Sequence, residues 1–150
     1  MEDITMDRAA LCAFITRQRY GVVSSTGTNG TPQSALVGIA STSRLEIIFD
    51  TVKSSRKYPN LLQRPMCSLV IGWSGEQTLQ LEGIAEEPQG EALRWFQDVY
   101  FAQWPECREH MSWPGIAYFV VHPEWIRYTD YDQKPPLIQE VVKESLAYDF

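Results

Sequence analysis

The sequence predicts a mostly β, α+β fold in which an antiparallel sheet curls into a small closed or split barrel with helices at its ends. About six or seven β-prone runs follow one another along the 150 residues. Short turns join most of these runs, which favours antiparallel pairing. Two segments with apolar residues at helical spacing supply the flanking helices. The length suits a single domain over residues 1–150, with a core of residues 4–131 and a C-terminal extension of residues 132–150.

The first expected element is a helix over residues 5–20. Thr5 is the expected N-cap, and the helix dipole favours the carboxylate of Asp7 in the first turn. Gly21 is expected to end this helix. Its apolar face consists of residues at positions i, i+3 and i+4, namely Leu11, Phe14 and Ile15.

A β-hairpin is expected over residues 21–40, where two β-prone runs flank the sequence GTNG. Asn-Gly is a strong hairpin signal because both residues tolerate positive φ. The alternating segment RLEIIFDT, residues 44–51, predicts the next strand. Its expected inward side chains are Leu45, Ile47 and Phe49.

A short helix is expected over residues 54–63, with Pro65 as its stop signal. Strands are expected over residues 66–73 and residues 77–87, and the second alternates with Leu79 and Leu81 inward.

Pro88 is expected to open a second long helix over residues 89–104, with a core-facing aromatic stripe formed by Leu93, Phe96, Tyr100 and Trp104. Two further strands are expected on either side of Pro123. The tail that begins near Pro135-Pro136 is expected to be a loosely attached extension.

Charge is unevenly distributed along the chain, whose net charge is −6. Residues 1–75 hold 8 basic and 5 acidic side chains, whereas residues 76–150 hold 5 basic and 14 acidic ones. A nucleic-acid binder usually shows a broad basic face, and this chain has one compact basic segment instead. No apolar run approaches the ~20 residues of a membrane span, and the N-terminus lacks the pattern of a signal peptide. We therefore expect a cytoplasmic protein with neither nucleic acid nor membrane as a partner.

The cysteines and histidines give no metal motif in the sequence. Cys12, Cys67 and Cys107 are odd in number and widely spaced, which predicts neither a disulfide framework nor a Cys-x-x-Cys pair. His110 and His122 are isolated, and a zinc site needs more nitrogen and sulfur ligands at closer spacing. No metal is expected.

The compact basic segment is TVKSSRKYPNLLQRP, residues 51–65, which contains four cations and no carboxylate. A serine hydroxyl donates one hydrogen bond to a phosphate oxygen, Arg56 adds a bidentate fork and Lys57 adds a point charge. Free N–H groups at a helix N-terminus would add to this attraction. These groups suit a terminal phosphate monoester. The alternative is an N-cap serine followed by solvated basic residues.

The order of these segments resembles the pyridoxamine 5′-phosphate oxidase-like family of flavin-binding split barrels, over residues 4–131. The pieces that carry the resemblance are KSSRK after IIFDT, then NLLQRP, LQLEGIAEE and HPEWIRYTDYD. The resemblance implies a six-stranded antiparallel split barrel with flanking helices. It also implies a homodimer that binds FMN at the interface between its two chains.

The resemblance further implies which residues contact the cofactor. The FMN phosphate would be held by Thr51, Ser55, Arg56 and Lys57. The backbone of Ala35, Leu36 and Val37, and that of Phe49, Asp50 and Thr51, would lie against the isoalloxazine. Gln77 and Thr78 would lie near the flavin from the adjacent strand. Trp125 and Arg127 would approach it across the interface.

The chain departs from the oxidase pattern in two places. Residues 34–40 lack the basic residues that meet the FMN phosphate, which predicts a lower FMN affinity or another cofactor, a deazaflavin or haem. The chain ends in ESLAYDF and lacks the oxidase's basic ending, so we do not expect it to oxidise pyridoxamine phosphate.

The leading hypothesis is an FMN-dependent oxidoreductase acting on a small molecule, in which the flavin supplies the chemistry. No side chain identifies itself as a catalytic acid or base. The alternatives are a non-catalytic flavin or haem carrier on the same barrel, and an interaction protein whose basic segment is only a solvated surface.

Overall fold

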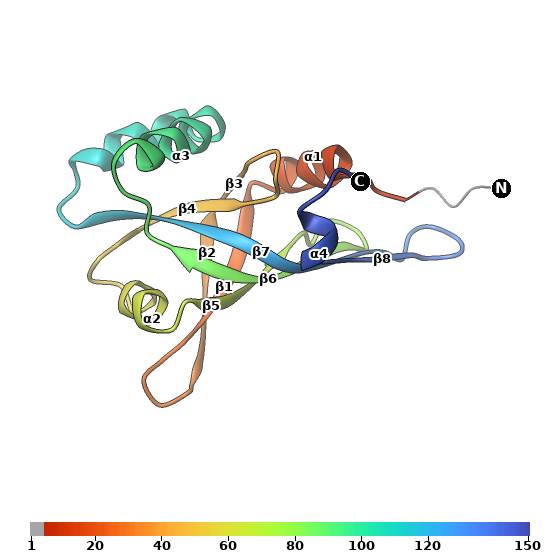
Figure 1. The fold of residues 1–150 in the computed structure, drawn as a ribbon, viewed down its shortest axis with the longest axis horizontal. Helices are drawn as coiled ribbons and strands as arrows, with labels where there is room; N and C mark the ends of the chain where they lie inside the picture. The colour runs from red at the N-terminus through yellow and green to blue at the C-terminus, as the bar shows by residue number, and fades with distance from the viewer. Residues whose placement is uncertain (1–4) are drawn as a thin grey trace.

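The computed structural model describes residues 5–150, and the eight strands of this part of the chain form one antiparallel sheet (Figure 1). The order in the sheet is β2-β1-β5-β6-β7-β4-β3, and β8 pairs with β7. The strands are β1 (Tyr20–Thr26), β2 (Pro32–Gly38), β3 (Ala40–Ser41), β4 (Ile47–Val52), β5 (Met66–Ile71), β6 (Gln77–Glu86), β7 (Ile116–Asp130) and β8 (Leu137–Val142). The helices are α1 (Arg8–Gln18), α2 (Lys57–Gln63), α3 (Gly90–Gln103), the 3-10 helix η1 (Pro105–Ser112) and α4 (Lys143–Leu146).

The expected fold class, an α+β split barrel, is confirmed. The two outermost strands in the sheet order, β2 and β3, follow each other in the chain with only Ile39 between them. The sheet therefore curls back on itself, and helices flank it (Figure 1). The expected count of six strands is exceeded by the short β3 and by β8. Strand β8 pairs with the second half of β7, where β4 no longer does.

Helix α1 is shorter than the sequence suggested, because its N-cap is Asp7 and not Thr5. The Asp7 carboxylate accepts a hydrogen bond from the Ala10 N–H at 2.8 Å. The helix ends at Gln18, and Arg19 takes a positive φ of 63° before β1 begins. The expected apolar face is confirmed, since Leu11, Phe14 and Ile15 are fully buried. None of the helices in residues 5–150 is long and apolar enough to span a membrane.

Strand β4 is buried on both faces because the molecule has two apolar clusters. Ile47 and Phe49 pack into the main core inside the barrel, as the alternating pattern predicted. Ile48 points the other way and is also fully buried, under α3. The expected aromatic stripe forms that second cluster: Tyr100 and Trp104 are buried, and Leu93 and Phe96 are partly buried.

The two strands expected around Pro123 are one continuous strand, β7. Its pairing with β6 shifts at a β-bulge, where Glu82 faces Trp125 and Gly83 faces Pro123. The extra residue in β7 lets a proline remain in the strand without breaking the sheet. Gly83 is required at this point, because a Cβ there would lie 2.5 Å from the carbonyl oxygen of His122.

The C-terminal extension is part of the sheet, so the expectation of a loosely attached tail was wrong. Strand β8 pairs with β7 over six residues of each strand, from Trp125 with Val142 to Asp130 with Leu137. The chain end then returns to α1, where the Arg8 N–H donates to the carbonyl oxygen of Phe150 at 2.9 Å.

Candidate functional site

A small cavity of about 110 Å³ lies between the β1–β2 hairpin and the start of α2, and we call it the basic pocket. It is lined by Val23, Ser25, Gln33, Ser34, Ala35, Arg56 and Lys57. Two cations thus line the pocket together with the Ser25 hydroxyl and the Gln33 carboxamide, whereas the Ser34 hydroxyl bonds to Ser24 on the outward side of the hairpin. The sequence predicted the cations, and the fold adds the polar side chains of the hairpin.

The approach to this pocket is a turn, where the sequence analysis placed the start of a helix. The Ser55 N–H donates to the carbonyl oxygen of Val52 at 2.9 Å. The hydroxyls of Thr51 and Ser55 lie 2.9 Å apart and form a hydrogen bond. Helix α2 begins only at Lys57 and has seven residues. Anion binding at this site therefore rests on side chains, because the expected row of free helical N–H groups does not begin at Ser54.

Burial leaves one cation of the pocket poorly solvated. The pKa of the Lys57 ammonium lies below its usual 10.5, mainly because burial penalises the charge, and the carboxylate of Asp50 offsets part of this shift. Neither Arg56 nor Lys57 forms an ion pair within residues 5–150. An anion in the pocket would supply the missing counter-charge.

Four side chains fasten α2 to the hairpin, and three of them, Ser25, Gln33 and Asn60, were not expected from the sequence. The buried Asn60 amide donates to the Ser25 hydroxyl at 3.1 Å and to the Gln33 side-chain oxygen at 2.9 Å. Arg64 donates to the carbonyl oxygen of Thr26 at 2.8 Å. The available signal was polarity at inward positions, since Ser25 lies on the core-facing side of β1 and is buried.

The remaining residues expected near the isoalloxazine have different surroundings. Ala35 lines the basic pocket, whereas Leu36 points outward and is 62% exposed. Val37 and Phe49 are buried in the main core. The side chain of Asp50 contacts His110, on the opposite face of β4 from Thr51.

Gln77 and Thr78 are not brought to the basic pocket within one chain. They begin β6 at the opposite end of the sheet from α2 (Figure 1). The Tyr128 hydroxyl donates to the Gln77 side-chain oxygen at 3.4 Å. The Thr78 hydroxyl donates to the carbonyl oxygen of Gly72 at 3.5 Å.

Trp125 and Arg127 lie on the outward side of the sheet, which we call the outer face. Arg127 forms an ion pair with Glu140 of β8 at 2.9 Å and pairs with Gln80 of β6. The same face carries apolar side chains on the other strands: Leu36 (62% exposed), Val70 (44%) and Met66 (73%). Leu36 and Val70 both pair with Val22, so the three form one row across β2, β1 and β5.

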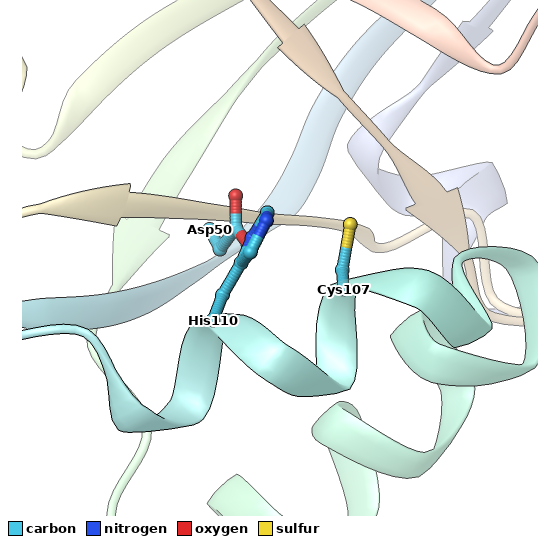
Figure 2. Close-up of side chains that lie close together, drawn as sticks. All are labelled: Asp50, Cys107 and His110. Carbon is cyan, nitrogen blue, oxygen red and sulfur yellow. The ribbon is translucent and has the colours of Figure 1, made fainter.

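A second polar group lies beneath η1, and we call it the Asp50 cluster: Asp50, Cys107 and His110 (Figure 2). Cys107 and His110 project from η1 towards β4, as Figure 2 shows. The Asp50 carboxylate lies 2.8 Å from Nδ1 of His110. One potential ligand atom from each residue lies within 4.8 Å of the other two. The local signal for this grouping was Cys-x-x-His at positions 107–110.

The surroundings of the Asp50 cluster disfavour further negative charge. Burial raises the pKa of the Cys107 thiol, and the Asp50 carboxylate raises it further. Burial and then Asp50 raise the pKa of Tyr118 to about 12. The Tyr118 hydroxyl is buried and makes no hydrogen bond within residues 5–150, although the side chain of Gln97 is close to it. Without a cation, Cys107 is therefore a neutral thiol and a poor nucleophile.

Known proteins resemble this chain over most of its length. A family model described as pyridoxamine 5′-phosphate oxidase matches residues 8–130. None of the curated proteins matches the sequence. The solved structure of a haem-binding protein from Mycobacterium smegmatis has a TM-score of 0.79 at 17% identity, covering 96% of this chain and 61% of that chain. This chain thus spans less than two thirds of that protein.

Two further solved structures are similar. One is a pyridoxamine 5′-phosphate oxidase-related, FMN-binding protein from Nostoc punctiforme, with a TM-score of 0.66 at 13% identity, covering 89% of this chain and 93% of that one. The other is General Stress Protein 26 from Bacillus anthracis, with a TM-score of 0.67 at 19% identity, covering 89% of this chain and 98% of that one. At these identities the likeness shows a shared fold.

Proposed function

The chain belongs to the pyridoxamine 5′-phosphate oxidase family, and from that premise we propose that it binds FMN and acts as an FMN-dependent oxidoreductase on a small molecule. The observation that carries the proposal is the basic pocket. Arg56 and Lys57 face hydroxyl and amide groups there and have no carboxylate partner within residues 5–150. A phosphate monoester supplies the anion that these groups lack.

The chemistry of the pocket fits a terminal phosphate better than the flavin ring. Its volume of about 110 Å³ suits a small anion, and its lining holds both hydrogen-bond donors and cations. Asn60 and Arg64 hold α2 against the hairpin, so the donors are positioned before a ligand arrives. Thr51 and Ser55 lie beside the pocket and can turn their hydroxyls from each other to the phosphate.

We further propose a homodimer formed through the outer face, with each FMN site completed by the second chain. The row of Leu36, Val22 and Val70 is an apolar strip on the outer face, and such exposed strips mark interaction sites. Leu36 is the chain neighbour of Ala35, which lines the basic pocket from the other face of β2. Trp125 and Arg127 lie on the same face, where a second chain would bring them near the first chain's flavin.

The flavin, when bound, supplies hydride and electron transfer. The protein residues bind the phosphate and orient the cofactor, and we assign no side chain as a catalytic acid or base. The acidic half of the chain, residues 76–150, would repel a second phosphorylated molecule, so we propose an unphosphorylated substrate. We also propose a cytoplasmic location, which is consistent with three free cysteines.

The second candidate is a non-catalytic carrier of flavin or haem on the same barrel. It is favoured by the similarity to the haem-binding protein from Mycobacterium smegmatis. One observation favours the flavin: neither His110 nor His122, the histidines that could ligate haem iron, lines the basic pocket.

Titration of the purified chain with FMN and with riboflavin tests the phosphate assignment. We expect FMN to bind at least about 100-fold more tightly, because riboflavin lacks the phosphate that Arg56 and Lys57 would hold. Equal affinities would contradict the assignment. Reduction of the bound flavin by NADH or NADPH, followed by turnover with an acceptor, would support the enzyme. Failure with all donors, together with tight FMN binding, would favour the carrier.

The interface is tested separately by Leu36→Asp, with Trp95→Asp on the exposed side of α3 as the matched control. We expect the Leu36 variant to be monomeric in light scattering and to bind FMN more weakly, and the Trp95 variant to remain dimeric. A dimer that survives Leu36→Asp would exclude this strip as the interface.

A further inference from the structure

We propose that the Asp50 cluster is a binding site for a divalent zinc ion, with Asp50, Cys107 and His110 as its three protein ligands. This site is separate from the basic pocket and independent of the FMN proposal. It also departs from the sequence-based expectation of no metal. Asp50 is distant in the chain from Cys107 and His110, and folding brings it to them.

The geometry of η1 explains why two of the ligands face the same way. A 3-10 helix has three residues per turn, so side chains at positions i and i+3 eclipse one another. Cys107 and His110 are three residues apart in η1 and therefore both project towards β4 (Figure 2). Asp50 projects to meet them, because its neighbours Phe49 and Thr51 use the opposite face of the strand.

The distances are close to those that a tetrahedral ion requires. Zinc ligand atoms lie about 2.0–2.3 Å from the ion, so two ligand atoms lie about 3.3–3.5 Å apart. The carboxylate of Asp50 and Nδ1 of His110 are now 2.8 Å apart, and the widest separation in the cluster is below 4.8 Å. Shifts of about 1 Å would place all three around one ion.

The donor set and its charge indicate which ion fits. A thiolate, an imidazole and a carboxylate are the zinc ligands of proteins, whereas calcium and magnesium prefer oxygen alone. The carboxylate of Asp50 and the thiolate of Cys107 together would neutralise a dication. Three protein ligands leave the fourth position open to water.

The walls of the site hold the ligands in place. The ring of Trp113 stacks on His110 with centroids 3.8 Å apart. The buried Tyr100 hydroxyl lies close to Asp50 and Cys107. Partners of this kind orient metal ligands. The side chains of Asp50 and His110 are 18% and 25% exposed, so an ion can reach the site from solvent.

The simpler alternative is an ion pair between Asp50 and His110 with a bystander cysteine. Cobalt titration separates the two, because cobalt ligated by a thiolate gives a charge-transfer band in the near ultraviolet and an ion pair binds no cobalt. The full-length chain is stripped with a chelator and titrated with Co²⁺, and the bound Co²⁺ is then displaced with Zn²⁺. We expect one equivalent of Co²⁺ per chain, a charge-transfer band, and loss of the band when Zn²⁺ is added.

Two ligand variants and two matched controls assign the site. We expect Cys107→Ser to abolish the charge-transfer band, and His110→Gln to weaken Co²⁺ binding by at least about 100-fold. Circular dichroism checks that each variant is folded, and His110→Gln keeps the test decisive if Cys107→Ser does not fold. The controls are Cys12→Ser, which removes another thiol, and His122→Gln, which removes the other histidine. Both should bind Co²⁺ as the unchanged chain does.

Several results would overturn the proposal. One is a stripped chain that binds neither Co²⁺ nor Zn²⁺. Another is a charge-transfer band that survives Cys107→Ser. A third is loss of binding in His122→Gln but not in His110→Gln, which would move the site to His122 and its partners Glu46 and Glu86.

Discussion

Asp50 and Thr51 are neighbours in β4, yet their side chains belong to sites of opposite character. Thr51 bonds to Ser55 next to the basic pocket, where two cations have no anionic partner among the described residues. Asp50 lies on the other face, where a carboxylate, a thiol and an imidazole gather beneath η1. We propose that one side binds an anion and the other a cation.

The difference follows from the burial of β4 on both faces. A sheet strand with one solvated face positions residues for one site only. Here the barrel core covers one face and α3 with η1 covers the other, so alternating side chains of a single strand reach two enclosed environments. The two sites use different side chains of the strand, although the Asp50 carboxylate still acts electrostatically on Lys57.

The largest expected effect comes from removing both cations of the basic pocket, Arg56→Ala with Lys57→Ala. We expect FMN binding to weaken by about 3–6 kcal/mol, because each charge-assisted bond contributes about 1.5–3 kcal/mol. Calorimetric titration measures this change. The matched control is Arg94→Ala with Lys134→Ala, which removes two exposed cations elsewhere. Co²⁺ binding should be the same in both doubles, and unchanged FMN affinity would exclude the phosphate site.

Gly83→Ala should destabilise the sheet that carries both sites. The new Cβ would lie 2.5 Å from the carbonyl oxygen of His122 and 2.7 Å from the Val121 side chain, so β7 must shift at its bulge. We expect a loss of about 1–3 kcal/mol in the free energy of unfolding. Denaturant titration measures it. Gly21→Ala is the control, because its Cβ would meet only side-chain atoms at 3.3 Å or more. Equal stabilities of the two variants would contradict the steric role of the bulge glycine.

Substitution of two tyrosines on opposite faces of β7 should change the free energy of unfolding by a smaller amount. The Tyr118 hydroxyl is buried beside Asp50 without a hydrogen bond, whereas the Tyr128 hydroxyl donates to Gln77. In metal-free protein we expect Tyr118→Phe to raise the free energy of unfolding by about 1 kcal/mol and Tyr128→Phe to lower it by a similar amount. Destabilisation by Tyr118→Phe would mean that its hydroxyl has a partner in solution.

The smallest expected effect is a pH dependence due to Lys57. Burial lowers its pKa below 10.5, so near that pH the unfolded chain binds more protons than the folded chain, and stability rises with pH. Relative to Lys57→Met, the unchanged chain should therefore gain stability as pH approaches 10.5. Unfolding measured at several alkaline pH values tests this. A constant difference between the two proteins would show that Lys57 is fully solvated.

Local sequence signals predicted most elements but not their junctions. The hairpin, α3 and the fully buried residues of α1 follow from turn residues and helical spacing. The continuity of β7 through Pro123 depends on a bulge opposite Gly83, which only the paired strand reveals. The place of β8 depends on the edge of β7 that β4 leaves free.

The candidate sites likewise combine residues that the sequence indicates with residues that only folding brings together. The cations of the basic pocket are adjacent in sequence, so composition and family resemblance found them. Gln33 is brought to them by the hairpin and bonds to Asn60 of α2, and no short-range pattern marks either residue as a site member. Asp50 lies 57 residues before Cys107, and their meeting depends on η1 packing over β4.

The most direct test of FMN binding is the visible absorption spectrum of the full-length chain after loading with excess FMN and desalting. We expect a retained flavin spectrum of about one FMN per chain, and its loss in the Arg56→Ala, Lys57→Ala double variant. A chain that is colourless after loading would contradict FMN binding at the basic pocket, and a Soret band in the protein as isolated would support haem instead.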